Sequence, residues 1–473
     1  APSKEASQIE GSKEFCKTIL ASKNIPTAKY KSFKDAGEAI KYAKELRDES
    51  EENLVVLKAD GLAAGKGVLI VSDAVDIENG AKNVLENKIF GDQVLLVEEY
   101  LEGFETSLMG FFDGESFKLF NPVRDHKTNY EGNVGPNTGG MGTFTPDMEA
   151  LMYRDEIKEQ IIDPFIEAIN INKIDYRGIV FFGLMITKDG PKVLEINTRF
   201  GDPETQVALM ALESDLLNLM MATSKRELSE CYIKINDKNI VNVVAASGGY
   251  PGSYEKGYEI KGLDKIHDVE VFYAGVKSED GKLLTNGGRV LSIAAADKSM
   301  EEAERIVYKE IERIEFKDMY YRKDIAPNVK RIYVNKKDEF DIFSEAVLKQ
   351  LQEHGINPSK CKLYKRYDIE GLTNKEIDLI KDTILREPPV DDIYVGDDAL
   401  SLQKSFKDVL VRQYKAGQFD QRERGLIDTI KSVIPGVNVA AHVAEVISFE
   451  CVDKDTMTKI KKVIINPVDE EEG

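Results

Sequence analysis

Residues 54–71 read LVVLKADGLAAGKGVLIV, and this stretch says most about the fold. An apolar run ends in Lys58, small residues lead to Gly67, and a second apolar run follows from Val68 to Val71. The pattern predicts two strands joined by a glycine-rich loop. A lysine that ends a buried strand needs an anion beside it, and backbone N–H groups of small residues can fold over phosphates. The stretch therefore favours a phosphate-binding loop, although an ordinary strand connection would also explain it.

The overall composition narrows the class of protein. The chain has 473 residues, of which 42% are hydrophobic and 31% charged, and this length predicts three or four globular domains. Its formal charge of −20 would repel nucleic acid and anionic membranes, so neither is an expected partner. An ATP site in such a chain must gather basic groups locally. Four scattered cysteines without a CxxC pair fit a reducing compartment, and we expect a cytoplasmic protein.

Carboxylates follow a second apolar run at residues 94–100. Glu98, Glu99, Tyr100 and Leu101 stand at the end of this predicted strand. There a carboxylate could accept a hydrogen bond from the amino group of adenine. Glu105 could bind the ribose hydroxyls. A solvated strand end is the simpler alternative.

A third stretch, Glu195-Ile196-Asn197, suits a metal ion. Strand alternation places Glu195 and Asn197 on one face. Two oxygen ligands that leave room for phosphate suit Mg²⁺, or Mn²⁺ in its place. Arg199 follows at the same two-residue spacing and is expected on the same face. Its guanidinium suits a phosphate or a carboxylate. A polar strand edge explains each residue singly but not the set.

Taken in order, these motifs and Lys13 resemble the nucleotide site of the ATP-grasp ligases. Longer strings narrow the resemblance to the glycinamide ribonucleotide synthetase family, the phosphoribosylamine–glycine ligases, over residues 1–326. These strings are Asp125–Lys127 (DHK), Gly135–Gly142 (GPNTGGMG), Arg199–Gln206 (RFGDPETQ), Thr285–Leu291 (TNGGRVL) and Tyr320–Ala326 (YYRKDIA).

The resemblance implies a reaction and a set of site residues. The reaction is ATP-dependent ligation of glycine to 5-phosphoribosylamine through a glycyl phosphate, in purine biosynthesis. The implied catalytic residues are Lys58, Arg199 and Arg289, and the implied metal ligands are Glu195 and Asn197. The implied nucleotide contacts are Lys13, Lys58, Gly65, Lys66, Gly67, Glu98, Glu99, Tyr100, Leu101 and Glu105. The implied substrate contacts are Asp125, His126, Lys127, Pro136, Asn137, Thr138, Gly139, Gly140, Arg199 and Asp202.

Three alternatives stay open at this point. His126 could be a general base, but substrate hydrogen bonding or loop structure is the preferred interpretation, because the attacking amine is already nucleophilic. The chain could also be an ATP-grasp ligase with another acid and amine. It could instead be a non-catalytic assembly module.

The last third of the chain contains an internal repeat. Phe340-Asp341 and Phe419-Asp420 each begin a predicted helix after a strand, and Pro389-Val390-Asp391 recurs as Pro467-Val468-Asp469 at nearly the same spacing. This part resembles the N-terminal domain of phosphoribosylformylglycinamidine synthase. The first residues, Ala1 to Glu5, resemble the junction after the ligase family's N-terminal domain. That domain is therefore expected to be missing, and it or other purine-pathway modules are expected partners.

The expected fold class is α+β, with an ATP-grasp fold, a small mixed-β ligase domain and a duplicated strand–helix–strand–helix domain. Residues 121–147 are predicted to be a long loop and residues 206–224 a single helix. The expected domains are 1–225 (with a subdomain at 54–120), 226–326, and 328–473 with repeats at 330–391 and 408–469.

Overall fold

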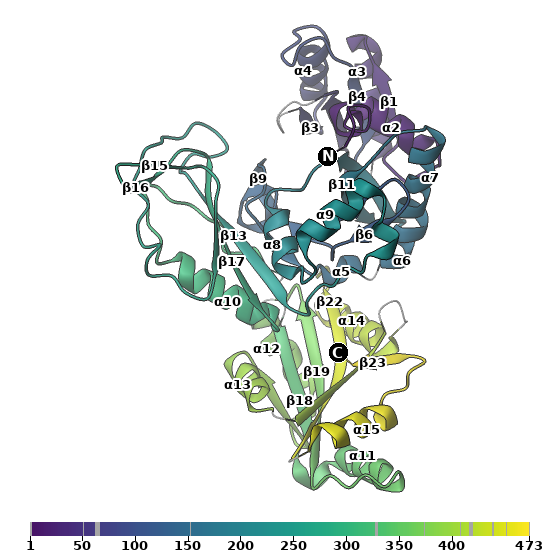
Figure 1. The fold of residues 1–473 in the computed structure, drawn as a ribbon, viewed down its shortest axis with the longest axis vertical. Coiled ribbons are helices and arrows are strands. Elements are labelled where there is room, and N and C mark those ends of the chain that lie inside the picture. Colours follow the sequence, from purple (N-terminus) through teal and green to yellow (C-terminus); the bar gives the residue numbers. More distant parts are fainter. Residues whose placement is uncertain are drawn as a thin grey trace. The chain divides into compact units, whose positions relative to one another are not determined.

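The computed structural model forms two compact units, Ala1–Ile325 and Ala326–Gly473, and each is described by itself (Figure 1). The predicted contacts Gly65 and Lys66, and Phe419 of the repeat, lie outside the described residues. No helix in the described part of the chain combines the length and the apolar character needed to cross a membrane. The structure describes residues 2–50, 52–61, 67–151, 153–326, 330–372, 374–406, 408–415, 420–437, 439–450 and 452–472.

A small four-stranded antiparallel sheet carries the two strands predicted from residues 54–71. Val55, Leu57 and Ala59 point toward two helices and form a core with them, so Lys58 points to the opposite face of the sheet. Glu98 is paired opposite Val56 and lies on that same face. The strand order is β1 (Tyr30–Phe33), β4 (Leu95–Glu99), β2 (Val55–Ala59) and β3 (Val68–Val71), and the helices are α3 (Ala36–Glu49) and α4 (Ala74–Leu85).

A second antiparallel sheet lies between two helical layers. One face packs against α2 (Lys13–Ala21) and α7 (Asp163–Ile171), and the other against α8 (Glu204–Ala211) and α9 (Leu216–Lys225). A bulge between Gly183 and Leu184 interrupts the register near the end that carries Glu195. The strand order is β12 (Gly190–Asn197), β11 (Gly178–Thr187), β5 (Phe104–Phe112) and β6 (Phe117–Leu119).

The prediction of one long loop at residues 121–147 was wrong. Four short strands lie in this region: β7 (Arg124–Asp125), β8 (Thr128–Tyr130), β9 (Val134–Asn137) and β10 (Gly142–Thr145). The segments β8 and β9 pair as a hairpin. β10 and β7 instead extend a five-stranded sheet whose other strands lie far along the chain. Pairing of this kind leaves no periodic pattern in the local sequence. That sheet has the order β14 (Glu270–Tyr273), β17 (Arg289–Asp297), β13 (Asn239–Ala246), β10 and β7, and α10 (Met300–Ile311) packs on it.

The prediction of one helix at residues 206–224 was also wrong, since α8 and α9 are separate helices. Leu212 is extended and forms a bridge with Ile235, which ends α8. The Asp215 carboxylate then accepts a hydrogen bond from the backbone N–H of Asn218 and starts α9. The apolar content hid this break, because the bridge depends on Ile235, which lies far from Leu212 along the chain.

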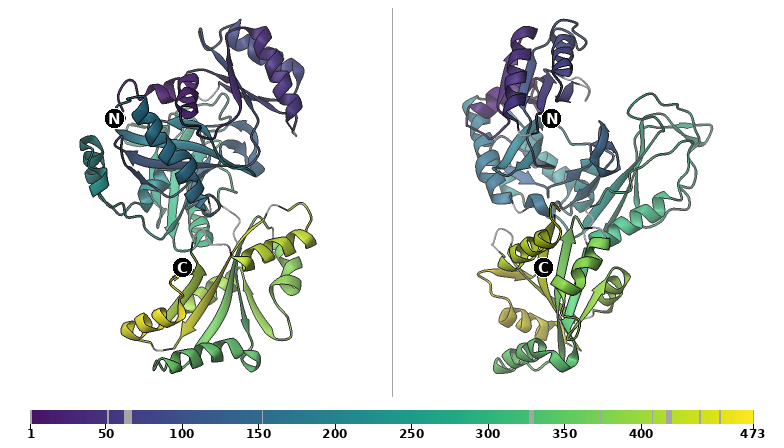
Figure 2. Two further views of the ribbon diagram at one scale, coloured as in Figure 1. Left: turned by 90° about the vertical axis from the view of Figure 1, so that its right-hand side faces the viewer. Right: turned by 180° about the vertical axis from the view of Figure 1, so that it is seen from behind.

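The second unit is a six-stranded antiparallel sheet whose helices can be followed from two sides in Figure 2. The predicted helix starts are confirmed, because Asp341 and Asp420 cap α11 and α14 through their carboxylates. The strand order is β20 (Asp391–Val395), β18 (Lys330–Lys336), β19 (Cys361–Glu370), β22 (Ala440–Phe449), β21 (Asp408–Tyr414) and β23 (Glu470–Glu472). The α-helices are α11 (Ile342–Glu353), α12 (Asn374–Ile380), α13 (Asp397–Ser405), α14 (Gln421–Val433) and α15 (Lys454–Ile464).

Candidate functional site

The face of the small sheet opposite α3 and α4 carries a buried ionic cluster, to which α2 contributes Lys17. Lys58 Nζ lies 2.8 Å from Glu98 Oε2, and Lys17 Nζ lies 3.2 Å from Glu98 Oε1. Burial opposes the charge on Glu98, but the two ammonium groups outweigh this and hold its pKa below the usual value. Glu98 is therefore not a solvated strand end. Sequence analysis missed Lys17, although it lies one helical turn after Lys13 on α2 and so shares a face with it.

Lys13 joins the start of α2 to the end of β2. Its Nζ donates hydrogen bonds of 2.9 Å to the carbonyl oxygens of Ala59 and Gly61, and its backbone N–H donates to Asp60 Oδ1. Burial, aided by the charge of Lys58, lowers the pKa of Lys13 although Asp60 counteracts this. Gly67 also lies at this strand end, where its carbonyl accepts from the N–H of Ala59. The start of the glycine-rich segment is thus held by the amine of Lys13.

The rest of the strand end after Glu98 has mixed surroundings. Glu99 Oε1 accepts from the backbone N–H of Lys29, and the apolar side chain of Leu101 is buried. Tyr100 is half-buried beside them. Glu105, predicted to hold ribose hydroxyls, forms a 2.6 Å ion pair with Lys127.

The two predicted metal ligands lie together at the end of β12. The Asn197 amide donates to Glu195 Oε1 at 3.2 Å. The Glu195 side chain is open to solvent, yet protein atoms crowd its carboxylate and oppose ionisation; Lys127 and Lys58 outweigh this and hold its pKa below the usual value. Among the described residues, no three His, Cys, Asp or Glu side chains gather closely enough to enclose a metal. An anionic carboxylate plus one amide oxygen fits Mg²⁺, which takes its remaining ligands from phosphate and water.

Arg199 extends beyond these ligands and is fixed at its base. Glu10 Oε1 accepts from Arg199 Nε at 2.9 Å, while Glu10 Oε2 accepts from the backbone N–H of Thr198. The Arg199 side chain is still 58% exposed. Glu10 was not predicted, because a single carboxylate in a short helix carries no signal in the sequence.

The predicted substrate loop is tied to two other predicted stretches by Arg289. Arg289 Nη1 donates to the carbonyl oxygens of Gly139 at 2.7 Å and of Asp202 at 2.9 Å, and its Nη2 donates to Asp202 Oδ2. Gly140 has φ +110°, and a Cβ there would lie 2.5 Å from Cδ of Pro203. The chain can approach this closely only without a side chain.

The Asp125–Lys127 segment contacts this loop, and the pKa values of its side chains are strongly shifted. Burial and the nearby Glu204 carboxylate raise the pKa of Asp125. Burial opposes the charge of Lys127, but Glu105 and Glu195 outweigh it and raise its pKa. Thr138 donates from both its backbone N–H and its hydroxyl to the carbonyl oxygen of Lys127. The segment therefore links the candidate metal ligands to the loop.

His126 is unsuited to collecting a proton at neutral pH. Burial and the positive charge of Arg322 lower its pKa to about 4. Its Nδ1 atom is buried and has no hydrogen-bond partner among the described residues, and its backbone pairs with that of Gly142 and Met141. These surroundings favour the predicted loop-supporting role over a general base.

A pocket of about 610 Å³ lies beside the substrate loop and includes the predicted contact Pro136. The predicted contact Asn137 is exposed in β9 and pairs with Thr128 across the hairpin. The Tyr250 hydroxyl, which lines the pocket, accepts a hydrogen bond from the N–H of Gly139. The pocket is lined by Asn129, Tyr130, Pro136, Ser247, Gly248, Gly249, Tyr250, Pro251, Gly252 and Tyr320.

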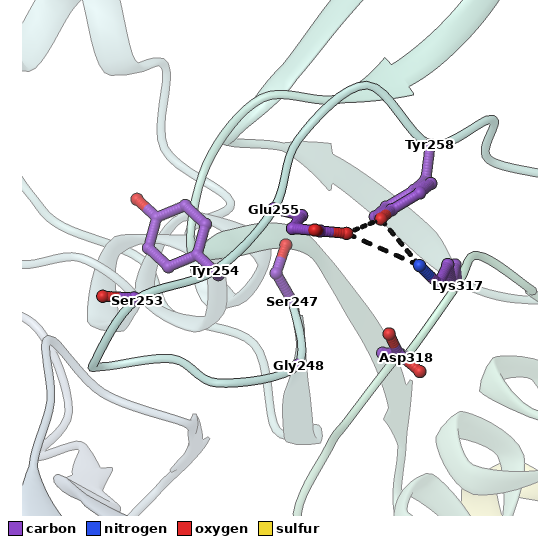
Figure 3. A pocket seen from close by; sticks show the side chains of 8 residues that line it. All are labelled: Ser247, Gly248, Ser253, Tyr254, Glu255, Tyr258, Lys317 and Asp318. Atoms are coloured by element: carbon purple, nitrogen blue, oxygen red, sulfur yellow. Dashed lines mark hydrogen bonds and ion pairs between the residues drawn. The ribbon is translucent and has the colours of Figure 1, made fainter.

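A second pocket of about 240 Å³ contains none of the predicted site residues (Figure 3). Lys317 Nζ donates to the Tyr258 hydroxyl at 2.9 Å and lies 3.5 Å from Glu255 Oε2, so its charge is already engaged. Ser247 and Gly248 line both pockets. This arrangement does not indicate a separate anion site.

Comparisons with known proteins agree on one family. Residues 11–205 match "Phosphoribosylglycinamide synthetase, ATP-grasp (A) domain", and residues 240–328 match the C domain of the same enzyme. A phosphoribosylamine–glycine ligase from Caldanaerobacter subterraneus subsp. tengcongensis is 45% identical over 331 residues, covering 69% of this chain and 78% of that protein. The trifunctional purine biosynthetic protein adenosine-3 of Gallus gallus is 42% identical over 333 residues, covering 69% and 33%. The solved phosphoribosylamine–glycine ligase of Thermotoga maritima has 35% identity and a TM-score of 0.63, covering 69% of this chain and 81% of that one.

Proposed function

The chain belongs to the phosphoribosylamine–glycine ligase family, and we propose that it joins glycine to 5-phosphoribosylamine with ATP as the energy source. The 45% identity over 78% of a named ligase carries this proposal. The structure supports it, because the described residues predicted for nucleotide, metal and substrate lie in three adjoining groups of one unit.

The proposed chemistry proceeds in two transfers. A carboxylate oxygen of glycine attacks the γ-phosphorus of ATP, so glycyl phosphate forms and ADP leaves. The amine of phosphoribosylamine then attacks the acyl carbon, the carbon–oxygen bond to phosphate breaks, and the amine loses one proton. Glycinamide ribonucleotide and phosphate are the products. Neither transfer needs a nucleophilic side chain, so positioning and charge stabilisation suffice.

The amines around the glycine-rich segment suit the phosphates of ATP. Lys58 would exchange the Glu98 carboxylate for a phosphate oxygen, and Lys13 lies beside it at the strand end. Glu195 and Asn197 would hold Mg²⁺, which supplies positive charge next to the transferred phosphoryl group. Arg199, fixed at its base by Glu10, would contact the phosphoryl or acyl phosphate group.

The substrate side of the site is proposed for the segment Asp125–Lys127 and the loop Pro136–Gly140. Lys127 is held as a cation by Glu105 and Glu195, so it can face the carboxylate of glycine or the new phosphate. The Arg289–Asp202 pair holds the loop against the RFGDPETQ stretch, which makes Arg289 a residue that orders the site. The neutral, tyrosine-lined pocket beside Pro136 lies where a sugar could be accommodated.

For the second unit we propose a duplicated domain related to the N-terminal domain of phosphoribosylformylglycinamidine synthase. The order strand, helix, strand, helix occurs in both halves, and an aspartate caps the first helix of each. Because this unit has its own cores and is compact by itself, an assembly role is the second candidate function.

The ligase proposal is tested by ADP release. With Mg·ATP, ADP release beyond a single turnover should require both glycine and phosphoribosylamine, and larger amino acids should not replace glycine. Equal turnover with another acid and amine would favour a different ATP-grasp reaction. Binding of Mg·ATP without turnover under all substrate combinations would favour the assembly role.

A further inference from the structure

The stretch Tyr320–Ala326 matches the family strings, yet none of the proposed catalytic steps uses it. Arg322 in this stretch is fully buried, with 0% of its surface exposed. A guanidinium group has five N–H donors in a fixed fork. Arg322 makes five hydrogen bonds: Nε and Nη2 to the two oxygens of Asp324, Nη2 to Asn133 Oδ1, and Nη1 to both the carbonyl and the hydroxyl oxygens of Thr128.

The partners of Arg322 lie in the hairpin that follows the Asp125–Lys127 segment. The Asp324 carboxylate that pairs with Arg322 also accepts from the backbone N–H of Gly132 at 2.8 Å. The Tyr320 hydroxyl donates to the carbonyl oxygen of Asn129 at 2.7 Å, and the N–H of Lys323 donates to Glu131. Residues 320–324 therefore hold the β8–β9 hairpin at several points along its length.

The geometry of this contact explains why an arginine is needed. Burying a charge is costly unless it is paired and every donor is bonded, and Arg322 meets both conditions. A lysine would keep the charge but could not reach Asp324, Asn133 and Thr128 together, because its ammonium lacks the planar fork. The contact thus fixes one position of the hairpin and also pairs the charges of Arg322 and Asp324.

The hairpin position in turn bears on the substrate site. Thr128 directly follows Lys127, whose ammonium pairs with Glu105 and whose carbonyl accepts two bonds from Thr138 of the substrate loop. Asn129, Tyr130 and Pro136 form one wall of the 610 Å³ pocket. A shift of the hairpin would therefore move the amine of Lys127 and this wall together.

We propose that Arg322 is a positioning residue for substrate binding, which fixes the β8–β9 hairpin and through it Lys127 and the substrate loop. The inference rests on the proposed function for the choice of substrates. It concerns glycine and phosphoribosylamine rather than ATP, because in the described part of the chain no hydrogen bond or ion pair joins Lys13, Lys58 or Glu98 to the hairpin.

Four variants of the full chain and one control separate geometry from charge and from folding. Arg322→Met removes both the fork and the charge, whereas Arg322→Lys keeps the charge. Asn133→Gly removes one exposed acceptor only; glycine tolerates the φ of +56° at this position, so the fold should persist. Asn133→Asp retains an acceptor there. Arg313→Met is the matched control, since Arg313 is partly exposed and bonds to Lys265 away from the hairpin.

The measurements are KM for glycine and for phosphoribosylamine, KM for ATP, and amide exchange of residues 128–137. In Arg322→Lys and Asn133→Gly we expect at least one substrate KM to rise about tenfold and twofold, respectively. We also expect faster exchange in the hairpin and an ATP KM within twofold of wild type. Asn133→Asp and Arg313→Met should match wild type.

A nuclear magnetic resonance titration of His126 adds a readout of the charge at residue 322, which Arg322→Lys keeps and Arg322→Met removes. Arg322, Arg124 and Asp324 are the charged groups that act on this ring. Its pKa of about 4 should rise in Arg322→Met and stay low in Arg322→Lys. Unchanged substrate KM values and hairpin exchange in both Arg322 variants would overturn the proposal. A wild-type chain without glycine-dependent turnover would instead count against the proposed function. Amide exchange in the hairpin would still test whether Arg322 fixes it.

Discussion

Lys58 Nζ lies 2.8 Å from Oε2 of Glu98, a carboxylate whose side chain is only 2% exposed and which also pairs with Lys17. Two lysines thus share one buried acid. If Lys58 moves to a phosphate, Lys17 remains to balance the charge of Glu98, which would otherwise be buried without a partner. The cluster therefore allows Lys58 to leave at a low cost in free energy.

The first prediction concerns ATP binding by Lys58. Lys58→Met removes a point charge from the proposed phosphate site, so the dissociation constant for Mg·ATP should rise by about tenfold or more. Isothermal titration calorimetry measures this directly. Lys41→Met on the exposed side of α3 is the control and should bind as wild type does. Equal affinity for Mg·ATP in Lys58→Met would show that Lys58 does not contribute to ATP binding.

The second prediction concerns the stability supplied by Glu98. Glu98→Gln leaves two buried ammonium groups without their carboxylate, which should lower the free energy of unfolding by about 3 kcal/mol at pH 7. The folded-state pKa of Glu98 is below its unfolded value, so this stability is present above about pH 4.3 and is lost as the pH falls further. Denaturant unfolding from pH 7 to pH 3.5 should show the two proteins converging. A pH-independent difference would contradict the ion-pair interpretation.

The third prediction concerns His126 and milder acid. Its folded-state pKa of about 4 lies below the unfolded value of about 6.5, so its contribution is present above pH 6.5 and is lost as the pH falls toward 4. Between pH 7 and pH 5 this amounts to roughly 2 kcal/mol. His126→Gln should lose less stability than wild type over this interval in denaturant unfolding. Parallel curves for the two proteins would show that His126 is not kept neutral by the fold.

The fourth prediction concerns the close approach at Gly140. Gly140→Ala places a methyl group 2.5 Å from Pro203 and 2.7 Å from Asp125, so the substrate loop must move and glycine-dependent turnover should fall at least tenfold. Gly257→Ala is a matched control, because Gly257 also has a positive φ, of +90°, but open space around it. Both changes carry the backbone strain of about 1 kcal/mol, and only the first adds a clash. Equal turnover in both variants would show that the position of the substrate loop does not affect catalysis.

Much of the fold could be predicted from local pattern. The strands on either side of the glycine-rich segment, the starts of α11 and α14 and the α+β class each depend on residues close together in the chain. The expected mixed-β sheet of the ligase domain was wrong, since the pairs of its five-stranded sheet are antiparallel. The strands at 124–145 and the break before Asp215 could not be predicted in this way. They depend on partners such as β13 and Ile235, which lie far along the chain.

The same distinction holds for the candidate site. Lys58, Glu98, Glu195 and Asn197 could be found because each stands at the end of an apolar strand. The residues that support them were missed: Lys17 and Glu10 act across long separations, and Arg322 was present in a family string without a role. Lone charged residues are usually solvated, so only the three-dimensional contacts distinguish these from the rest.

The formation of glycyl phosphate is the central claim, and the fate of oxygen tests it most directly. Glycine labelled with ¹⁸O in its carboxylate is supplied with Mg·ATP and phosphoribosylamine, and the released phosphate is analysed by mass spectrometry. Because a carboxylate oxygen becomes the bridge to phosphorus, each phosphate should carry one ¹⁸O atom. Phosphate released in a glycine-dependent reaction without ¹⁸O, or no glycine-dependent phosphate at all, would contradict glycine activation by this chain.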